Sequence, residues 1–370
     1  MQILKKTNLK ALEKAIKIGP QETIKILETK GLTGRGGAGF PTAKKWLFAL
    51  NSQSDEKFVI CNADEGEPGT FKDKFIIENN PETLVEGILI AATTISAKKA
   101  FIYLRGEYSH LEPKLKKAIK LVTQKSKAGI EIELVIGAGA YICGEETALI
   151  ESIEGNRGQP HYQPPYPVVK GLWDKPTIVN NVETLTCAAQ AILFDDWNTY
   201  LRLFSVSGNV TKPGVYELPF NVKLSEIMKL AQPKNKVKAV YFGCYGGCMP
   251  YKDIELTPEN VCGESCIHGS CSIIVVDETN SILDLSYVVS KFFAYESCGK
   301  CTPCREGTIR ALMIVRKIRS GQATEEDLKI LQELGEHIGQ TSLCGLGKSA
   351  TNHLLTSLKH FRHDFEERLR

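Results

Sequence analysis

The sequence predicts an α/β fold built on a parallel sheet, followed by a small β-rich region and a C-terminal helical bundle. Three observations support this prediction. Apolar strands alternate with amphipathic helices between residues 57 and 136. Short apolar stretches separated by glycine and proline follow, and helical periodicity then runs from Ser281 to the end. We therefore expect three domains, at residues 1–202, 203–277 and 278–370.

Composition places the chain among ordinary globular proteins. Its 370 residues are 42% hydrophobic and 24% charged, which is enough for a large core. The formal charge of +3 is spread along the chain, so nothing indicates nucleic acid or membrane-surface binding. No apolar run reaches the length of a membrane span. Because Met1 to Lys6 lacks a signal-peptide pattern, we expect a cytoplasmic protein whose twelve cysteines serve metals rather than disulfides.

The first element is a pair of short helices between Leu9 and Thr29, broken at Gly19-Pro20. A glycine loop follows, and Gly34 to Gly39 spell GxGxxG. A helix rather than a strand leads into this loop, so the usual Rossmann context is missing. Glycines let backbone amides close on a phosphate, and the nearby cations Arg35 and Lys45 could neutralise it. A flexible surface turn is the alternative.

The alternation that predicts the parallel sheet comes next. Strands are expected at residues 57–61, 100–104 and 131–136, with helices at 82–96 and 112–125 between them. Parallel sheets bind ligands beyond the carboxyl ends of their strands. Polar segments follow each strand at this point, at residues 62–70, 105–107 and 137–147.

Three acids lie within four residues after the first strand, at Asp64, Glu65 and Glu67. Such a cluster suits a sugar or ribityl chain, since carboxylates accept hydrogen bonds from hydroxyl groups, and Gly66 and Gly69 allow a close approach. A divalent metal ion or plain solvated acids are the alternatives. The proline-rich segment from Gly155 to Asn181 is expected to be extended and to cover a site, with a helix starting near its end.

The β-rich region holds expected strands at residues 204–206, 215–218 and 239–242. It also contains five cysteines whose spacing matches no standard ligand set. They could bind an extra metal or cluster, or be buried thiols. These five residues are Cys244, Cys248, Cys262, Cys266 and Cys271.

The helical region contains Cys298, Cys301 and Cys304 in a CxxCxxC pattern, with Cys344 further along. Three thiolates from one tight loop and a fourth from elsewhere are typical of a [4Fe-4S] cluster. Zinc is the alternative, although zinc sites usually pair two CxxC motifs. Thr324 and Asp327 resemble a capping box, and one final helix is expected from about Ser349 to Arg370, with Cys344 in the loop before it.

Four motifs together resemble the flavin- and NADH-binding subunit of respiratory complex I, the NuoF type, and the related diaphorase subunits of NAD-linked hydrogenases and formate dehydrogenases. They are GRGGAGFPT at Gly34 to Thr42, CNADEGEPGTFKD at Cys61 to Asp73, GAGAYICGEETAL at Gly137 to Leu149 and ESCGKCTPCREGT at Glu296 to Thr308. The resemblance covers nearly the whole chain. It implies a Rossmann-like FMN-binding domain, a β-grasp domain of the SLBB type and a helical bundle with a [4Fe-4S] cluster.

The resemblance also implies site residues. The positions implied for FMN are Gly34, Arg35, Gly36, Gly37, Lys45, Asn62, Asp64, Glu65, Gly144, Glu145, Asn180 and Asn181. Those implied for NADH are Phe40, Phe48, Glu67, Tyr141 and Glu146, and the candidate catalytic residues are Glu65 and Glu67. Cys298, Cys301, Cys304 and Cys344 would carry the cluster. A carboxylate at Glu146 would repel a 2′-phosphate and favour NAD over NADP.

The implied activity is NADH oxidation, with a hydride passing to FMN and single electrons leaving through the cluster. The implied partners are a NuoE-like [2Fe-2S] subunit and a NuoG-like iron-sulfur subunit, in a complex peripheral to the inner face of the membrane. The chain departs from the family at Gln163 and Tyr166, where relatives usually have Lys and Phe, and at His161 in place of an arginine. These departures motivate an alternative, an electron-transfer or scaffold subunit that uses a donor other than NADH.

Overall fold

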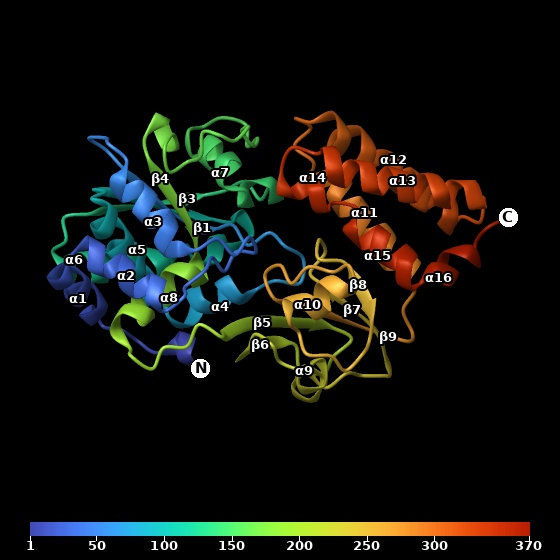
Figure 1. The fold of residues 1–370 in the computed structure, drawn as a ribbon, viewed down its shortest axis with the longest axis horizontal. Helices are drawn as coiled ribbons and strands as arrows, with labels where there is room; N and C mark the ends of the chain where they lie inside the picture. Colours follow the sequence, from blue (N-terminus) through green and yellow to red (C-terminus); the bar gives the residue numbers. More distant parts are fainter. The chain divides into compact units, whose positions relative to one another are not determined.

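The computed structural model describes residues 1–370 and divides into two compact units (Figure 1). The first unit comprises Met1–Gly66 and Phe71–Arg202, and the second comprises Leu203–Arg370 together with the short segment Glu67–Thr70. The segment that follows the first strand therefore contributes four residues to the second unit.

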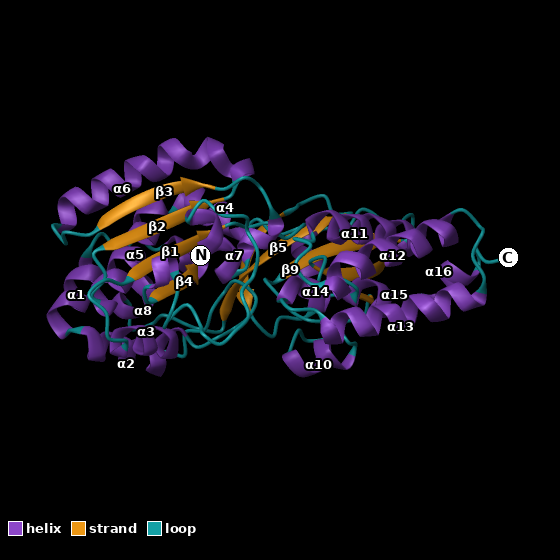
Figure 2. Ribbon diagram, turned by 90° about the horizontal axis from the view of Figure 1, so that it is seen from above, coloured by secondary structure: helices purple, strands orange, loops and turns teal.

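The first unit is built on a four-stranded parallel sheet with the strand order β3-β2-β1-β4. Figure 2 shows these strands side by side in that order. Their bounds are Phe58–Ala63 (β1), Lys99–Leu104 (β2), Glu131–Ile136 (β3) and Thr177–Asn181 (β4). The three strands predicted from the alternation are confirmed. The sequence prediction omitted β4, because this short strand follows a proline-rich segment and runs directly into a helix.

Eight α-helices accompany this sheet. They are α1 (Lys10–Ile18), α2 (Pro20–Thr29), α3 (Thr42–Asn51), α4 (Lys72–Asn79), α5 (Pro81–Ile95), α6 (Glu112–Ser126), α7 (Glu146–Ile153) and α8 (Val182–Leu193). Four short 3₁₀ helices lie at Gln2–Leu4, Gly106–Leu111, Tyr141–Gly144 and Leu172–Asp174. The predicted break between α1 and α2 is confirmed, since Gly19 has a φ of 83° and Pro20 opens the second helix.

Helix α5 is the centre of the helical layer and packs directly against α6, α8 and α1. Thirteen of its fifteen residues are buried. Its approach to α8 is close enough that a Cβ atom built on Gly87 would lie 2.0 Å from the carbonyl oxygen of Leu185. The two helices can therefore meet only where α5 carries no side chain.

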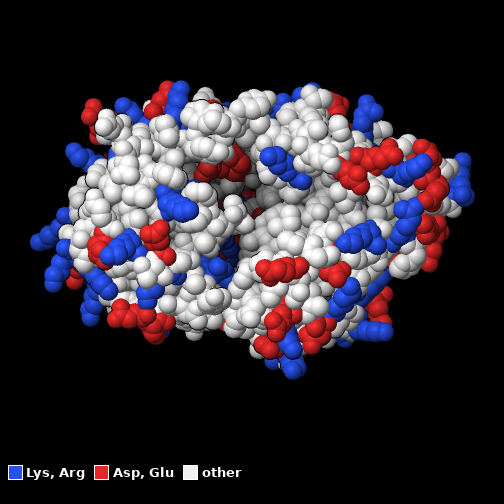
Figure 3. Space-filling model, viewed as in Figure 1, with Lys and Arg blue, Asp and Glu red and all other residues white.

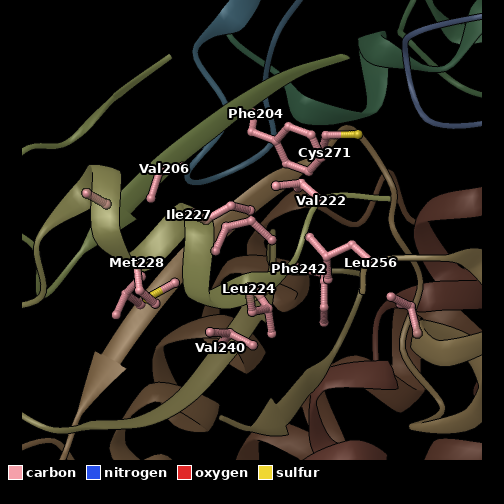
Figure 4. Close-up of a cluster of buried hydrophobic side chains, with 14 of the residues drawn as sticks. Phe204, Val206, Val222, Leu224, Ile227, Met228, Val240, Phe242, Leu256 and Cys271 are labelled. Carbon is pink, nitrogen blue, oxygen red and sulfur yellow. The ribbon is translucent and has the colours of Figure 1, made fainter. Parts of the chain in front are cut away.

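The second unit contains a mixed sheet with the order β6-β5-β9-β7-β8. Its strands are Leu201–Gly208 (β5), Gly214–Pro219 (β6), Val237–Phe242 (β7), Cys248–Pro250 (β8) and Ser272–Asp277 (β9). Strand β9 pairs in parallel with β5 and antiparallel with β7. Helices α9 (Leu224–Ala231) and α10 (Pro258–Gly263) accompany the sheet. Figure 4 shows the apolar cluster between α9 and the strands, to which Phe204, Ile227 and Phe242 contribute buried side chains.

The remaining helices of this unit are α11 (Ile282–Glu296), α12 (Thr302–Arg319), α13 (Glu325–Thr341), α14 (Gly345–Ser349), α15 (Asn352–His360) and α16 (Arg362–Glu366). The capping box predicted at Thr324 and Asp327 is present. The prediction of one final helix from about Ser349 to Arg370 is wrong, because the chain breaks at Thr351 and at Phe361, where φ is −135°. Phe361 instead turns its buried ring into the core.

One apolar core joins the sheet and the helices of the second unit, since Tyr241 and Val276 pack with Leu328 and Phe365. The division of this unit at residues 277 and 278 stays a prediction. No helix is both long and apolar enough to cross a membrane. On the face seen in Figure 3, Lys and Arg side chains alternate with Asp and Glu, and no continuous basic surface appears.

Candidate functional site

A cavity of about 640 Å³ lies within the first unit, at the carboxyl ends of β1 and β4. These two strands are neighbours, although the chain has travelled through β2 and β3 between them. The sheet order therefore reverses at this point, which is where open α/β sheets place their ligands. Asn62 from β1 and Asn180 and Asn181 from β4 line the cavity.

The glycine loop forms one wall of the cavity through Gly34, Gly36 and Gly39. A Cβ atom on Gly36 would lie 3.3 Å from the Cβ atom of Asn181, so this wall is tight. Gly37 and Gly39 have φ values of 121° and 67°, which favour glycine. The loop is therefore shaped to bring its backbone, rather than side chains, to the cavity.

Arg35 does not line the cavity, although it lies within the loop. Its side chain is buried, and its guanidinium donates hydrogen bonds of 3.1 Å to the carbonyl oxygens of Leu201 and Thr199. Its backbone N–H donates to the hydroxyl of Thr184. In this structure Arg35 fixes the loop onto the end of the first unit.

Lys45 from α3 is the cation that lines the cavity. Its ammonium lies 2.9 Å from a carboxylate oxygen of Glu146 and also donates to the carbonyl of Val179. The rings of Phe40 and Phe48 line the cavity as well, and these residues are 45% and 54% exposed, so each ring is accessible to a planar ligand. The cavity thus combines an ion pair with two exposed aromatic rings.

The asparagines and Glu145 hold the rim of the cavity in place. The Asn62 amide donates to the carbonyl of Gly144, and Trp46 donates to the Asn180 side chain. The carboxylate of Glu145 caps α7 by accepting from the N–H groups of Thr147 and Ala148. Gln163, Tyr166, Pro167 and Val168 of the proline-rich segment also line the cavity, as does Thr177 at the start of β4.

A buried charge network lies behind Asn181 and was not predicted from the sequence. Lys72 is 2% exposed and contacts the carboxylates of Asp73 and Glu183 at 2.7 and 3.1 Å. Burial alone would lower the pKa of Lys72, but the surrounding acids raise it above its ordinary value. Asn181 donates to Asp73 and accepts from Lys72, so the network orients a cavity-lining side chain. Only the contacts of the folded chain reveal it, because Lys72 and Glu183 are far apart in the sequence.

Glu65 borders this network. Its carboxylate accepts hydrogen bonds from the N–H groups of Asp73 and Lys74 at the start of α4, and from the Tyr108 hydroxyl. Burial and the neighbouring Asp73 carboxylate raise the pKa of Glu65 to about 7. Glu65 does not line the cavity, and neither do Gly37 or Asp64.

Glu67 belongs to the second unit, and its carboxylate is buried there. It accepts hydrogen bonds from the backbone N–H groups of Cys244 and Tyr245 at 2.5 and 3.2 Å. In the first unit, Tyr141 packs against Gly66, where a Cβ atom would lie 2.8 Å from its ring. Of the five residues implied for NADH, Phe40, Phe48 and Glu146 line the cavity, whereas Glu67 and Tyr141 do not.

The four cysteines of the proposed cluster gather at the starts of two helices in the second unit. Cys301 and Cys344 are the N-cap residues of α12 and α14, and Cys304 lies in the first turn of α12. Burial and the three neighbouring cysteines raise the pKa of the Cys304 thiol to about 11. The N-termini of α12 and α14 beside these sulfurs act in the opposite direction and favour the thiolates that a cluster needs. This donor set fits an iron-sulfur cluster.

No group of three or more His, Cys, Asp or Glu side chains is arranged to hold a single metal ion. At the four cysteines, the CxxCxxC loop with a distant fourth cysteine is typical of a [4Fe-4S] cluster, whereas zinc sites usually pair two CxxC motifs. The possible extra metal among the five cysteines of the β-rich region stays a prediction, and the surroundings of these cysteines favour the alternative of buried thiols. There Cys266 and Cys271 pack in the apolar cluster of Figure 4, and burial raises the pKa values of Cys244 and Cys248. These are buried thiols, and the fifth, Cys262, is exposed.

Comparison with known proteins gives two family matches. Residues 27–190 match the Nuo51 FMN-binding domain, and residues 284–368 match the NADH-ubiquinone oxidoreductase-F iron-sulfur binding region. The chain is 42% identical to the NADH-quinone oxidoreductase F subunit of Aquifex aeolicus, over 99% of this chain and 90% of that protein. It is 37% identical to the NADP-reducing hydrogenase subunit HndC of Solidesulfovibrio fructosivorans, over 96% and 77%.

A solved structure is also similar. The NAD⁺-reducing [NiFe]-hydrogenase in the H₂-reduced state contains a chain that aligns with a TM-score of 0.89 and 39% identity, covering 97% of this chain. This chain spans 65% of that hydrogenase chain's own length.

Proposed function

Because the chain belongs to the family of the NADH-quinone oxidoreductase F subunit, whose members oxidise NADH at FMN and pass electrons through a [4Fe-4S] cluster, we propose that the cavity of the first unit holds the FMN and receives the nicotinamide. The family assignment confirms the first functional prediction over the alternative of a donor other than NADH. The position of the cavity at the reversal of strand order carries the proposal.

The cavity fits FMN in size and in chemistry. Its 640 Å³ lies within the range of cofactor sites, roughly 300 to 1,000 Å³. We assign phosphate binding to the backbone of the glycine loop and to Lys45, and the ribityl and ring contacts to Asn62, Asn180 and Asn181. Arg35 and Glu65 do not line the cavity, and their hydrogen bonds hold the neighbouring loops in position.

The nucleotide would enter along the exposed rings of Phe40 and Phe48, which offer faces for an adenine to stack on. The carboxylate of Glu146 lines the same cavity and would favour NAD over NADP. Bound flavin supplies the change from a two-electron donor to a one-electron acceptor. The chain itself needs no acid or base for a hydride transfer, so its task is to align the two rings and exclude water. The catalytic roles predicted for Glu65 and Glu67 are therefore better described as positioning.

We assign the cluster to Cys298, Cys301, Cys304 and Cys344, with the N-termini of α12 and α14 stabilising its negative charge. The electrons would leave to separate subunits of the NuoE-like [2Fe-2S] and NuoG-like types, in an assembly peripheral to the inner face of the membrane. A hydrogenase assembly that runs the reaction toward NAD reduction is the variant suggested by the solved relative.

Two finer points of the fold belong to the same proposal. The strand order 3-2-1-4 of the first sheet is that of a Rossmann-like half, which supports this description of the FMN-binding domain. The mixed sheet with α9 packed on it supports a β-grasp domain of the SLBB type.

The test is anaerobic titration of the FMN- and iron-reconstituted chain with NADH. We expect bleaching of the flavin absorbance at one NADH per flavin, followed by reduction of the cluster. Gly36→Val, which fills the tight wall beside Asn181, should abolish flavin binding while leaving the iron content unchanged. A flavin-loaded chain that NADH leaves oxidised would overturn the proposal.

A further inference from the structure

We propose that the second unit carries a binding site for a small phosphate-type oxyanion at the end of the helical bundle remote from the cysteines. The site is a cavity of about 440 Å³ lined by three arginines, Arg316, Arg319 and Arg368. We call it the arginine cavity. Arg319 and Cys304 lie on the same helix, so the cavity is about 20 Å along the axis from the cluster cysteines. It therefore belongs to neither of the sites described above.

Three separate segments converge to build the cavity. Arg316 and Arg319 come from the last turn of α12, Ser281 from the N-cap of α11, and Arg368 from the segment after α16. That last segment is fixed by the N–H of Arg370, which donates to the carbonyl of Ala323. Arginines at the end of a helix commonly offset its dipole. Compensation of the helix dipole does not account for Arg368, because this residue lies in the segment after α16 and not on α12.

The donors outnumber the acceptors in this cavity. Arg319 is paired with Asp284 at 2.7 Å and lies over the ring of Tyr287. Neither Arg316 nor Arg368 has a carboxylate within ion-pair distance, so two guanidinium groups keep their full donor capacity. With three arginines and one aspartate, the wall carries a net charge of +2.

The N-terminus of α11 adds backbone donors to the same cavity. Leu283 lines it, and the N–H of Leu283 has no hydrogen-bond acceptor, whereas that of Asp284 donates to the Ser281 hydroxyl. A helix of fifteen residues presents positive charge at this end. Guanidinium forks and a helix N-terminus together match the tetrahedral oxygens of a phosphate.

The lining also limits the class of ligand. Leu283 is its single apolar residue, and no aromatic ring belongs to the wall. A nucleotide base would find no aromatic ring in this lining to stack on. The cavity therefore fits inorganic phosphate, pyrophosphate or a sugar phosphate, and it does not fit a dinucleotide.

The test is calorimetric titration of the FMN-loaded chain with inorganic phosphate and with pyrophosphate, in a phosphate-free buffer. Bound FMN keeps the anions away from the flavin phosphate site. We expect one saturable site per chain. Arg316→Gln and Arg368→Gln should each weaken it by about tenfold, because each removes a charge-assisted hydrogen bond. Asp284→Asn should tighten it several-fold, since it removes the repelling carboxylate and frees Arg319.

The matched control is Arg310→Gln, which removes an exposed arginine of the same helix that does not line the cavity. It should bind phosphate as the unmodified chain does. Absence of saturable binding, or equal weakening by Arg310→Gln, would overturn the proposal. Iron content measured on each variant shows that the second unit, which carries the cluster cysteines, has folded, and NADH bleaching reports separately on the redox function.

Discussion

The surroundings of Glu65 raise the pKa of its carboxyl group into a range that a titration of stability against pH can detect. Burial beside Asp73 raises its pKa from 4.5 to about 7 in the folded chain. Between pH 4.5 and about pH 7, the Glu65 carboxyl group keeps its proton in the folded chain but has lost it in the unfolded chain. The free energy of unfolding therefore falls as pH rises through this window, and the loss is complete above about pH 7.

We expect Glu65→Gln to remove this pH dependence, because a neutral amide has no proton to lose. The unmodified chain should lose up to about 3 kcal/mol relative to the variant between pH 5 and pH 8. Urea unfolding at both pH values measures the difference. The exposed Glu56→Gln serves as the control. If the free energy of unfolding of Glu65→Gln changed with pH as that of the unmodified chain does between pH 5 and pH 8, the pKa of Glu65 would not be raised.

Glu146 gives a second prediction for a single residue. Its carboxylate lies 2.9 Å from Lys45 in the cavity, so Glu146→Gln removes a negative charge and releases a cation at once. We expect the ratio of kcat/KM for NADPH to that for NADH to rise by about tenfold, corresponding to roughly 1.4 kcal/mol. Steady-state ferricyanide reduction with both nucleotides measures it. An unchanged ratio with full flavin content would place the 2′-hydroxyl away from Glu146.

Single residues also mark the limit of what the sequence could predict. The glycine spacing predicts a backbone-lined wall, and Gly34, Gly36 and Gly39 do line the cavity. The same motif gives no sign that the Arg35 guanidinium turns to the carbonyls of Thr199 and Leu201, since those acceptors lie far along the chain. Short-range spacing determines loop shape, whereas side-chain partners depend on the folded chain.

At the scale of whole elements, the spacing of apolar residues and the positions of turn residues predicted most of the first unit. The break at Gly19-Pro20 and the strands β1, β2 and β3 could be predicted directly, because each is bounded by turn residues. The sequence prediction omitted helices α3, α4 and α7, and two further elements show why local pattern fails. The short strand β4 has Asn180 and Asn181 at its end and resembles a helix start, and the aromatic Phe361 interrupts the final helix through tertiary packing that overrides local propensity.

The contact between α5 and α8 supplies a prediction at this scale. Gly87→Ala would place a methyl group 2.0 Å from the Leu185 carbonyl oxygen, and backbone on both sides prevents relief. We expect a loss of about 3 kcal/mol in the free energy of unfolding, despite the better helix propensity of alanine. Gly263→Ala has no atom within 4 Å of its new Cβ and should change stability by less than about 1 kcal/mol. Equal effects of the two variants would mean that the helices can separate freely.

At the scale of the whole molecule, the two cofactor sites lie in different units. All residues of the cavity belong to the first unit, and all four cluster cysteines belong to the second. We therefore expect Cys344→Ser to lose iron while it keeps FMN, the reverse of Gly36→Val. Cys262→Ser should keep both cofactors, because this thiol is exposed and is not one of the four cysteines assigned to the cluster.

Flavin released by acid and iron released to a chelator, each measured per chain, would check this pattern. Simultaneous loss of flavin and iron in Cys344→Ser would show that the two units fold as one. Retention of full iron in that variant would remove Cys344 from the cluster. The Cys262→Ser result also tests whether the five cysteines of the β-rich region bind an extra metal.

The residues Glu67–Thr70 give the chain an unusual route, since it enters the second unit for four residues, returns to the first, and enters again at Leu203. The Glu67 carboxylate finds its backbone donors at Cys244 and Tyr245. A fragment that ends at Arg202 would contain Glu67 without these backbone donors, so exchanging halves between relatives at this residue would separate the carboxylate from its partners. Recombination that respects the architecture must transplant the tetrapeptide together with the C-terminal half.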